Sequence, residues 1–162
     1  MKRRMLVGTL AATLLVLATA GPAAAAVEGG RRHYDFPKHN CAGAVPTHVD
    51  LYLRASGGLL DGRIRYFSGT CSAAANSIHI YTIILWQYRG SGNWRNVAWS
   101  GSHDMDVRDG DETWHSPVFN CAGEKHTNYH VEVQYRVHWK NGTSTNTRDD
   151  NSYDWNPGFC TG

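Results

Sequence analysis

Residues 128–139, NYHVEVQYRVHW, show the clearest alternation of apolar and polar side chains in the chain. One face of a strand over this segment would carry Tyr129, Val131, Val133, Tyr135, Val137 and Trp139. The intervening residues are polar, which is typical of a strand with one face in a core and the other in solvent. Residues 140–143, KNGT, predict a hairpin, because Asn-Gly adopts the positive φ angles of a type I′ turn. A returning strand is therefore expected over residues 143–147.

Other short segments carry strand signals separated by turn residues, and they are 49–54, 64–66, 78–88, 94–99 and 114–118. Residues 78–88, IHIYTIILWQY, are apolar on both faces and predict a central strand. If this strand alternates regularly, one of its faces carries Ile78, Ile80, Thr82, Ile84 and Trp86. No segment of ten or more residues repeats with the period of a helix.

Seven or eight short strands predict an all-β fold, a small antiparallel β-sandwich with an immunoglobulin-like arrangement. A small closed β-barrel is the alternative. The sandwich is expected to occupy residues 47–162 as a single domain, which is enough chain for one core. Residues 27–46 are rich in Gly, Pro, His and charge, and are expected to form an extended N-terminal arm.

Residues 1–26 have the three parts of a secretory signal peptide. A basic start, KRR at residues 2–4, precedes an apolar run to residue 20 and a small-residue end, Ala24-Ala25-Ala26. We expect cleavage before Val27 and a secreted, extracellular protein. The apolar run is interrupted and is shorter than the ~20 residues that a bilayer requires, so no membrane span is expected. The alanine-rich signal favours a bacterial origin.

The charge balance after cleavage argues against a nucleic-acid partner. Thirteen of the sixteen Lys and Arg residues remain beside fourteen Asp and Glu, because three lie in the signal peptide, and the formal net charge becomes −1. No basic run remains to contact a phosphate backbone.

Four cysteines, Cys41, Cys71, Cys121 and Cys160, lie in the predicted mature chain. An even number in an exported protein predicts disulfides. Structural zinc sites, the alternative, usually take cysteines in close pairs, and these are 30, 50 and 39 residues apart. Cys41 and Cys71 flank the first predicted hairpin, and Cys121 and Cys160 flank the last. In an antiparallel hairpin the start of one strand lies beside the end of its partner, so we predict Cys41–Cys71 and Cys121–Cys160.

The sequence contains two candidate metal sites. His130 and His138 share a strand face with Glu132 and Arg136, and a neighbouring strand could add a ligand. The loop over residues 104–112 offers the carboxylates of Asp104, Asp106 and Asp109 to Ca²⁺, although its spacing does not fit an EF-hand. A solvated sheet face and a simple Asp-Gly turn are the respective alternatives.

Exposed aromatic side chains offer a binding surface of another kind. Trp94, Trp99, Trp114 and Tyr52 could form a platform for sugar rings or a protein, or they could fill the core. Trp94 and Trp99 are five residues apart and would lie on opposite faces of a regular strand. Gly101-Ser102-His103-Asp104 holds the residue types of a catalytic triad, but neighbours on a strand point to opposite faces and cannot assemble one.

Together these features favour a secreted, non-catalytic binding module that acts as a monomer without a cofactor. Its expected partner is an extracellular protein or a cell-wall or polysaccharide surface. One alternative is a small extracellular hydrolase, because a site built from scattered residues leaves no motif. Another is a secreted proteinase inhibitor, with residues 72–77 after Cys71 as its exposed loop.

Overall fold

The computed structural model describes residues 25–36, 47–67, 75–106, 112–124 and 127–158 of the 162-residue chain. Within these ranges the chain is all-β. The strands are β1 (Val27–Asp35), β2 (His48–Ser56), β3 (Leu59–Phe67), β4 (Ala75–Tyr88), β5 (Trp94–Ser100), β6 (His103–Asp106), β7 (Glu112–His115), β8 (Phe119–Asn120), β9 (Tyr129–Trp139) and β10 (Arg148–Asn151). The described part contains no helix, and so none long and apolar enough to cross a membrane.

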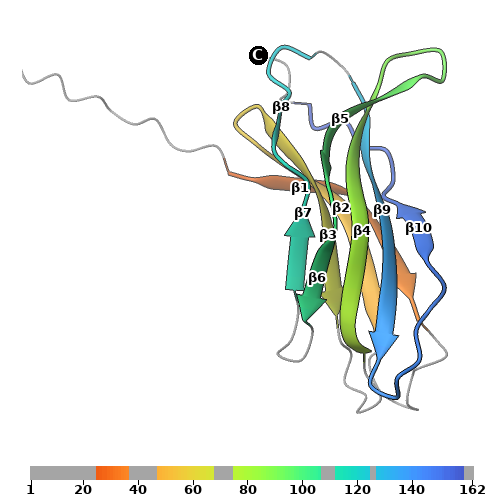
Figure 1. The fold of residues 1–162 in the computed structure, drawn as a ribbon. Coiled ribbons are helices and arrows are strands. Elements are labelled where there is room, and N and C mark those ends of the chain that lie inside the picture. The colour runs from red at the N-terminus through yellow and green to blue at the C-terminus, as the bar shows by residue number, and fades with distance from the viewer. Residues whose placement is uncertain (1–24, 37–46, 68–74, 107–111, 125–126, 159–162) are drawn as a thin grey trace, which may run out of the picture.

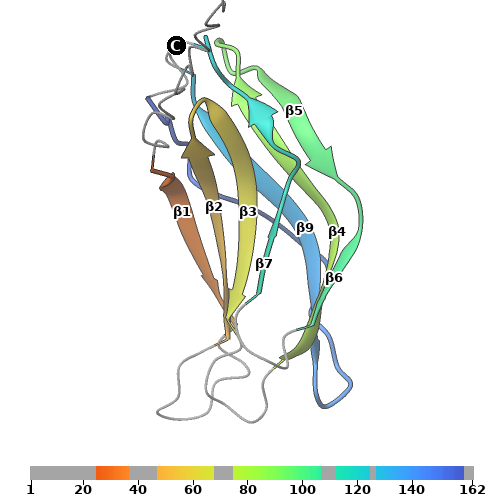
Figure 2. The same ribbon diagram turned by 90° about the vertical axis from the view of Figure 1, so that its left-hand side faces the viewer.

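The strands form two antiparallel sheets that lie face to face, as the two layers in Figures 1 and 2 show. The first sheet has the order β1-β2-β3-β7, and β8 also pairs with β3. The second sheet has the order β10-β9-β4-β5, and β6 also pairs with β4. Two layers with a shared core confirm the predicted antiparallel all-β architecture.

The strand order of the first sheet differs from the immunoglobulin-like arrangement that the sequence suggested. In immunoglobulin constant-type domains the fifth and fourth strands complete the sheet begun by the first two. Here β3 follows β2 in the same sheet, because Gly57 and Gly58 adopt positive φ angles of 58° and 79° and close a tight hairpin. The chain reaches the second sheet only after β3.

The core lies between the two inner faces. Burial alternates without interruption along β9, so the six apolar residues predicted to face inward are all buried. From the first sheet, fully buried side chains include Val49, Leu51, Leu53, Ile64 and Tyr66. Gly62 of β3 meets Val131 of β9 across the core, and a Cβ atom built at Gly62 would lie 2.6 Å from Val131 Cγ2. A glycine is therefore what permits this close contact between the sheets.

Strand β4 changes phase in its middle. Ile78 and Ile80 face the core, and so do Ile83 and Leu85. The pairing of β4 with β9 shifts register between Ile80 and Thr82, which indicates a β-bulge. The prediction that a single face runs from Ile78 to Trp86 was therefore wrong, because one extra residue moves every later side chain to the opposite face.

Residues 27–35, expected in the N-terminal arm, form β1 and pair with β2. An edge strand needs no apolar period when its main chain is paired and its side chains have other contacts. The Arg31 guanidinium lies 4.7 Å from the Tyr52 ring centre. The main chain at Gly29 is in close contact with the Trp155 indole, because an added Cβ atom would lie 2.1 Å from the indole Cε2 atom. The rest of the predicted arm, from residue 37, lies outside the described residues.

Strands β1 and β10 belong to different sheets and are linked by Tyr34. The Tyr34 hydroxyl donates to the carbonyl oxygen of Asn151 over 2.5 Å and accepts from the Asn151 N–H over 3.2 Å. These two bonds join the sheets along one edge of the sandwich.

The segment after β9 returns later than predicted. Ser144 makes an isolated bridge to His138, and the strand proper begins at Arg148. In between, the pairing is partial. The Trp139 N–H donates to the Thr143 carbonyl oxygen and the Thr145 N–H donates to the Val137 carbonyl oxygen, each over 2.9 Å, but the Val137 N–H donates over 3.1 Å to the Thr145 side-chain hydroxyl and not to a main-chain carbonyl. A threonine hydroxyl thus takes one donor from the ladder of the strand predicted over residues 143–147.

Cys121, which follows β8, is fully buried, and no cysteine among the described residues is free. Cys41, Cys71 and Cys160 lie outside the described residues, so both disulfide pairings stay predictions. The first half of the expected inhibitory loop, residues 72–74, also lies outside them, whereas residues 75–77 belong to strand β4.

Candidate functional site

The outer face of the second sheet carries a group of aromatic side chains that strands β5, β4 and β9 bring together. Cross-strand pairing arranges this face in rows, which read in that strand order Trp94–Tyr88, Asn96–Trp86–His130 and Trp99–Ile84–Glu132. We call Trp86, Tyr88, Trp94 and Trp99 the aromatic face. Paired residues in an antiparallel sheet share a face, so the register alone gathers these rings.

Trp94 and Trp99 lie on the same side of the sheet despite their odd spacing. Ala98 pairs with Leu85, but Asn96 pairs with Trp86, so Val97 is an extra residue on β5. This β-bulge restores Trp94 to the outer face that Trp99 occupies. The expectation of opposite faces assumed a regular strand, and the bulge removes that assumption.

The rings at one end of this face are held by packing. The Trp94 ring centre lies 4.2 Å from that of His130 and 5.2 Å from that of Tyr88. His130 is oriented in turn by Asp154, whose Oδ1 lies 3.2 Å from the His130 Nδ1 atom. Trp99 differs from them because 62% of its surface remains exposed. An exposed indole beside supported rings is the kind of surface that marks a binding site.

Sequence reasoning found Trp94 and Trp99 but missed Trp86 and Tyr88. Trp86 seemed to belong to the core face of β4, and only the bulge after Ile80 places it outside. The available signal was that residues 78–88 are apolar on both faces. Only one face of this strand packs in the core, so the apolar residues of the other face must lie on the outside of the sheet.

The other two aromatic residues of the predicted platform lie elsewhere. Trp114 is on β7, packs against the core and stacks on His103 with ring centres 3.6 Å apart. Tyr52 is on the outer face of the first sheet, is 3% exposed and is covered by Arg31. The four residues therefore do not form one platform.

The structure also separates the predicted metal ligands. His130 and His138 are eight residues apart on β9, which corresponds to about 27 Å along a strand. Asp104 and Asp106 lie in strand β6 and not in a loop, and Asp109 lies outside the described residues. Neither predicted set of ligands converges in the described part of the chain.

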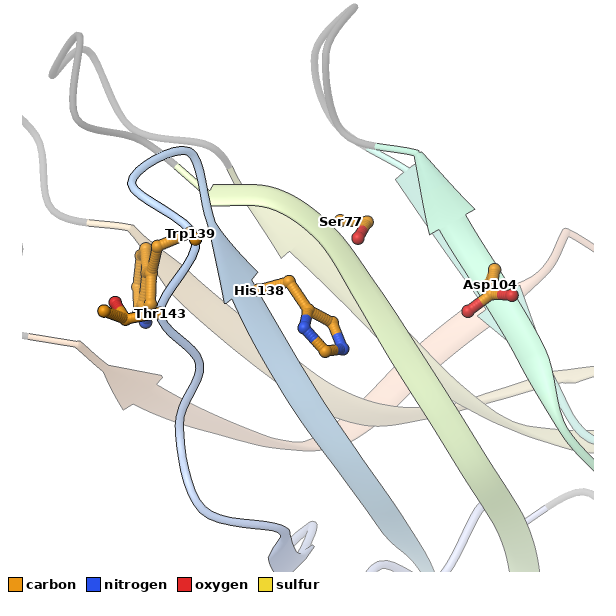
Figure 3. A pocket seen from close by; sticks show the side chains of 6 residues that line it. Ser77, Asp104, His138, Trp139 and Thr143 are labelled. Carbon is orange, nitrogen blue, oxygen red and sulfur yellow. The ribbon is translucent and has the colours of Figure 1, made fainter.

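His138 instead borders a shallow hollow of about 480 Å³ at the end of β9, and Figure 3 shows its side chains. The lining residues are Ser77, Asp104, His138, Trp139, Gly142 and Thr143. This described lining offers one imidazole and one carboxylate, fewer than the three protein ligands of a typical zinc site.

Asp104 takes part in a second arrangement, with His79 and Ser102. The Asp104 Oδ1 atom lies 2.5 Å from His79 Nδ1, and the Ser102 Oγ atom lies 3.3 Å from His79 Nε2. This is the order of contacts in a Ser-His-Asp triad. The histidine is His79 of β4 and not the neighbouring His103. This agrees with the expectation that adjacent residues of one strand, which point to opposite faces, cannot assemble a triad. The Asp104 side chain is 77% exposed, however, whereas a triad carboxylate is buried.

One cluster with metal-ligand geometry lies on the first sheet, in His33, Asp35 and His48. Burial opposes a charge on His33, but hydrogen bonds to Asp50 and Asp35 raise its pKa above the usual value. Sequence reasoning missed this cluster because it placed His33 and Asp35 in an arm. The spacing His-x-Asp was the available signal, since alternate residues of a strand share a face.

Comparison with protein-family models, with curated protein sequences and with solved structures finds no match to this chain.

Proposed function

We propose that this protein is a secreted, monomeric binding module whose aromatic face holds an extended polysaccharide. The observation that carries the proposal is the bulge at Val97, which leaves Trp99 exposed on the same face as Trp94, Trp86 and Tyr88. The proposal includes removal of residues 1–26 on export and the disulfides Cys41–Cys71 and Cys121–Cys160. It includes no cofactor.

The chemistry of the aromatic face suits sugar rings better than a protein surface. A pyranose ring has an apolar face of C–H groups, which packs on the electron-rich face of an indole, and a rim of hydroxyl groups. The aromatic rows are interleaved with the polar side chains Asn96 and Glu132. A stable protein interface buries about 800 Å² per partner around an apolar centre, and this alternation of rings and polar groups gives a narrower apolar track.

Binding to a panel of polysaccharides tests the proposal. Wild-type protein and the Trp99→Ala variant are compared by affinity electrophoresis in gels containing soluble β-linked glucans, and by co-sedimentation with insoluble cellulose, chitin and peptidoglycan. The proposal predicts that at least one polysaccharide retains the wild type and that Trp99→Ala weakens the retention by about tenfold or more.

A matched control is Tyr153→Ala, because Tyr153 is 60% exposed but packs beside Arg32 of β1. It should retain wild-type binding. Absence of binding to every polysaccharide, or equal loss in both variants, would contradict the proposal. A protein partner whose capture depends on Trp99 would replace the polysaccharide as ligand.

A second candidate function is ester hydrolysis, and the contacts between Ser102, His79 and Asp104 favour it. His79 would remove the proton from the Ser102 hydroxyl as its oxygen attacks the ester carbonyl carbon, and would return that proton to the departing alcohol. Water would then hydrolyse the acyl-serine, and Asp104 would stabilise the imidazolium in both steps. Hydrolysis of p-nitrophenyl acetate by the wild type that is abolished by Ser102→Ala would support this function. The control His103→Gln changes a histidine that stacks on Trp114 instead. An absent or Ser102-independent rate excludes it.

A further inference from the structure

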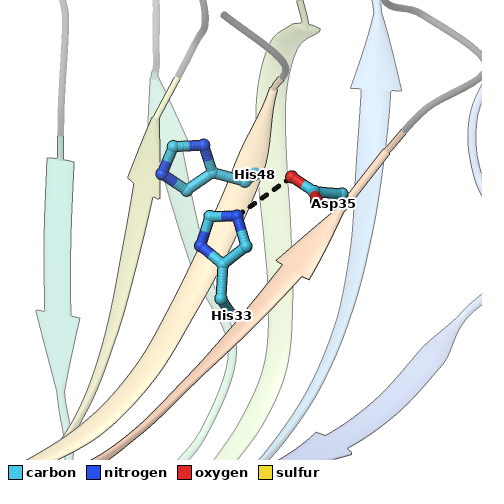
Figure 4. Close-up of side chains that lie close together, drawn as sticks. All are labelled: His33, Asp35 and His48. Atoms are coloured by element: carbon cyan, nitrogen blue, oxygen red, sulfur yellow. Dashed lines mark hydrogen bonds and ion pairs between the residues drawn. The ribbon is translucent and has the colours of Figure 1, made fainter.

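His33, Asp35 and His48 lie together on the outer face of the first sheet, as Figure 4 shows. His33 and Asp35 are alternate residues of β1, so both point outward. His48 of β2 pairs directly with Asp35. One ligand atom from each of the three lies within 4.8 Å of the other two.

We propose that these three side chains bind a divalent transition-metal ion of the Zn²⁺ class. Two imidazoles and one carboxylate are the ligands that such ions prefer, and three protein ligands leave a position for water. Zinc bound at about 2.1 Å separates its ligand atoms by about 3 to 4 Å, so side-chain rotation that shortens the present separations of up to 4.8 Å would close the site. The exposure of His33 and Asp35 leaves the open position accessible from solvent.

The surroundings of His33 have the form expected around a metal ligand. Its Nδ1 atom lies 2.8 Å from Asp50 Oδ1, and the Asp50 side chain is only 6% exposed. Arg31 donates to the other Asp50 oxygen over 2.8 Å, which fixes the carboxylate. A metal-binding histidine commonly donates its second ring N–H to such a carboxylate, which sets the tautomer and the ring orientation.

The opposite ring nitrogen of His33 faces the proposed ion. Its Nε2 atom lies 2.9 Å from Asp35 Oδ1. At this distance a proton bridges the two atoms, and a metal ion would displace that proton and bind both atoms from one side, because bonds of about 2.1 Å do not fit along a line of 2.9 Å. His48 is positioned on the other side by stacking on Phe67, with ring centres 4.2 Å apart. These contacts hold all three ligands in the absence of an ion.

Calorimetric titration with Zn²⁺ of purified, chelator-treated protein without a polyhistidine tag tests the site. The wild type should bind one Zn²⁺ per chain, and His48→Gln and Asp35→Asn should each weaken binding by more than tenfold. Asp50→Asn should weaken it by about 10- to 100-fold, as expected for a carboxylate that orients a ligand. Mg²⁺ should not compete.

The matched control is His79→Gln, because His79 also lies beside a carboxylate, at 2.5 Å from Asp104, but has no second histidine in that contact. It should bind Zn²⁺ like the wild type. Loss of affinity in this variant, unchanged affinity in His48→Gln, or no binding by the wild type would overturn the proposal. Circular dichroism checks that each variant is folded. If a variant is unfolded, the wild-type protein provides the test instead. Zn²⁺ must then shift the imidazole NMR signals of both His33 and His48, and unshifted signals would overturn the proposal.

Discussion

Trp94 and Trp99 are five residues apart on β5 and yet share the outer face of the second sheet, because Val97 is accommodated as a β-bulge. The bulge also separates their roles. Trp94 is packed between Tyr88 and His130, whereas Trp99 is mostly exposed. Trp94 therefore stabilises the aromatic face by packing, and Trp99 is the indole that a ligand can reach.

This difference predicts that replacing Trp94 and replacing Trp99 affect stability unequally. Trp94→Ala removes two aromatic contacts and should lower the free energy of unfolding by about 1–3 kcal/mol. Trp99→Ala should change it by no more than about 0.5 kcal/mol, because the side chain is exposed. Urea denaturation measures both. Equal losses in the two variants would show that Trp99 is a structural residue.

Close contact between the sheets predicts a coupling between Gly62 and Val131. Gly62→Ala should cost about 1–3 kcal/mol, because the new methyl group overlaps Val131 Cγ2. Combination with Val131→Gly removes both the Cγ2 atom and the Cβ atom, which lies 2.7 Å from the new methyl group, so the double variant should lose less than the sum of the single losses by about 0.5 kcal/mol or more. Gly101→Ala is the control, since the new methyl group there would lie 4.0 Å from the nearest atom, which belongs to the Trp99 ring. Additive losses would contradict the observed packing of β3 on β9.

The bonds between Tyr34 and Asn151 predict a measurable contribution to stability. Tyr34→Phe deletes the hydroxyl and leaves the Asn151 carbonyl without that donor, so it should cost about 1 kcal/mol. Tyr153→Phe, at an exposed tyrosine, should cost nothing measurable. A neutral Tyr34→Phe would mean that water replaces the hydroxyl and that this edge does not depend on it.

Three buried or partly buried tyrosines predict a loss of stability at alkaline pH. Burial raises the pKa of Tyr34, of Tyr129 and, by the largest amount, of Tyr135. In the unfolded chain these phenols lose their protons near pH 10, so above that pH the unfolded state binds fewer protons than the folded state. The free energy of unfolding should therefore be constant from pH 8 to about 9.5 and fall as the pH rises further. A constant value up to pH 11 would contradict the burial of these hydroxyl groups.

The predicted disulfides can be mapped directly. Peptide mapping without reduction should find Cys41 joined to Cys71 and Cys121 joined to Cys160. Each bridge should contribute about 3–4 kcal/mol, so reduction should destabilise the domain strongly. Any peptide that joins Cys71 to Cys121 would refute both pairings.

The sequence predicted the buried face of a strand correctly where the strand is regular and no bulge interrupts the alternation of its side chains. The alternation of β9 identified its buried face residue by residue, because a strand between two others has no freedom to slip. The bulges after Ile80 and at Val97 could not be foreseen, since each depends on pairing with a neighbouring strand. They also decide which aromatic residues share a face, so the aromatic face could be only half predicted.

Strand β1 shows a different limit. It lacks an apolar period because main-chain pairing, Arg31 over Tyr52 and the contact of Gly29 with Trp155 hold it, and none of these contacts leaves a local pattern. The cluster of His33, Asp35 and His48 was missed for the same reason, since it exists only once β1 is paired with β2.

The most direct test of the aromatic face uses the indole N–H signals of the six tryptophans in a two-dimensional ¹H–¹⁵N NMR spectrum during titration with a bound oligosaccharide. The signals of Trp94 and Trp99 should shift and saturate together, while those of Trp114, Trp139 and Trp155 should stay in place. Shifts confined to Trp114, Trp139 or Trp155, or no shift at saturating ligand, would contradict the assignment of this face as the binding site.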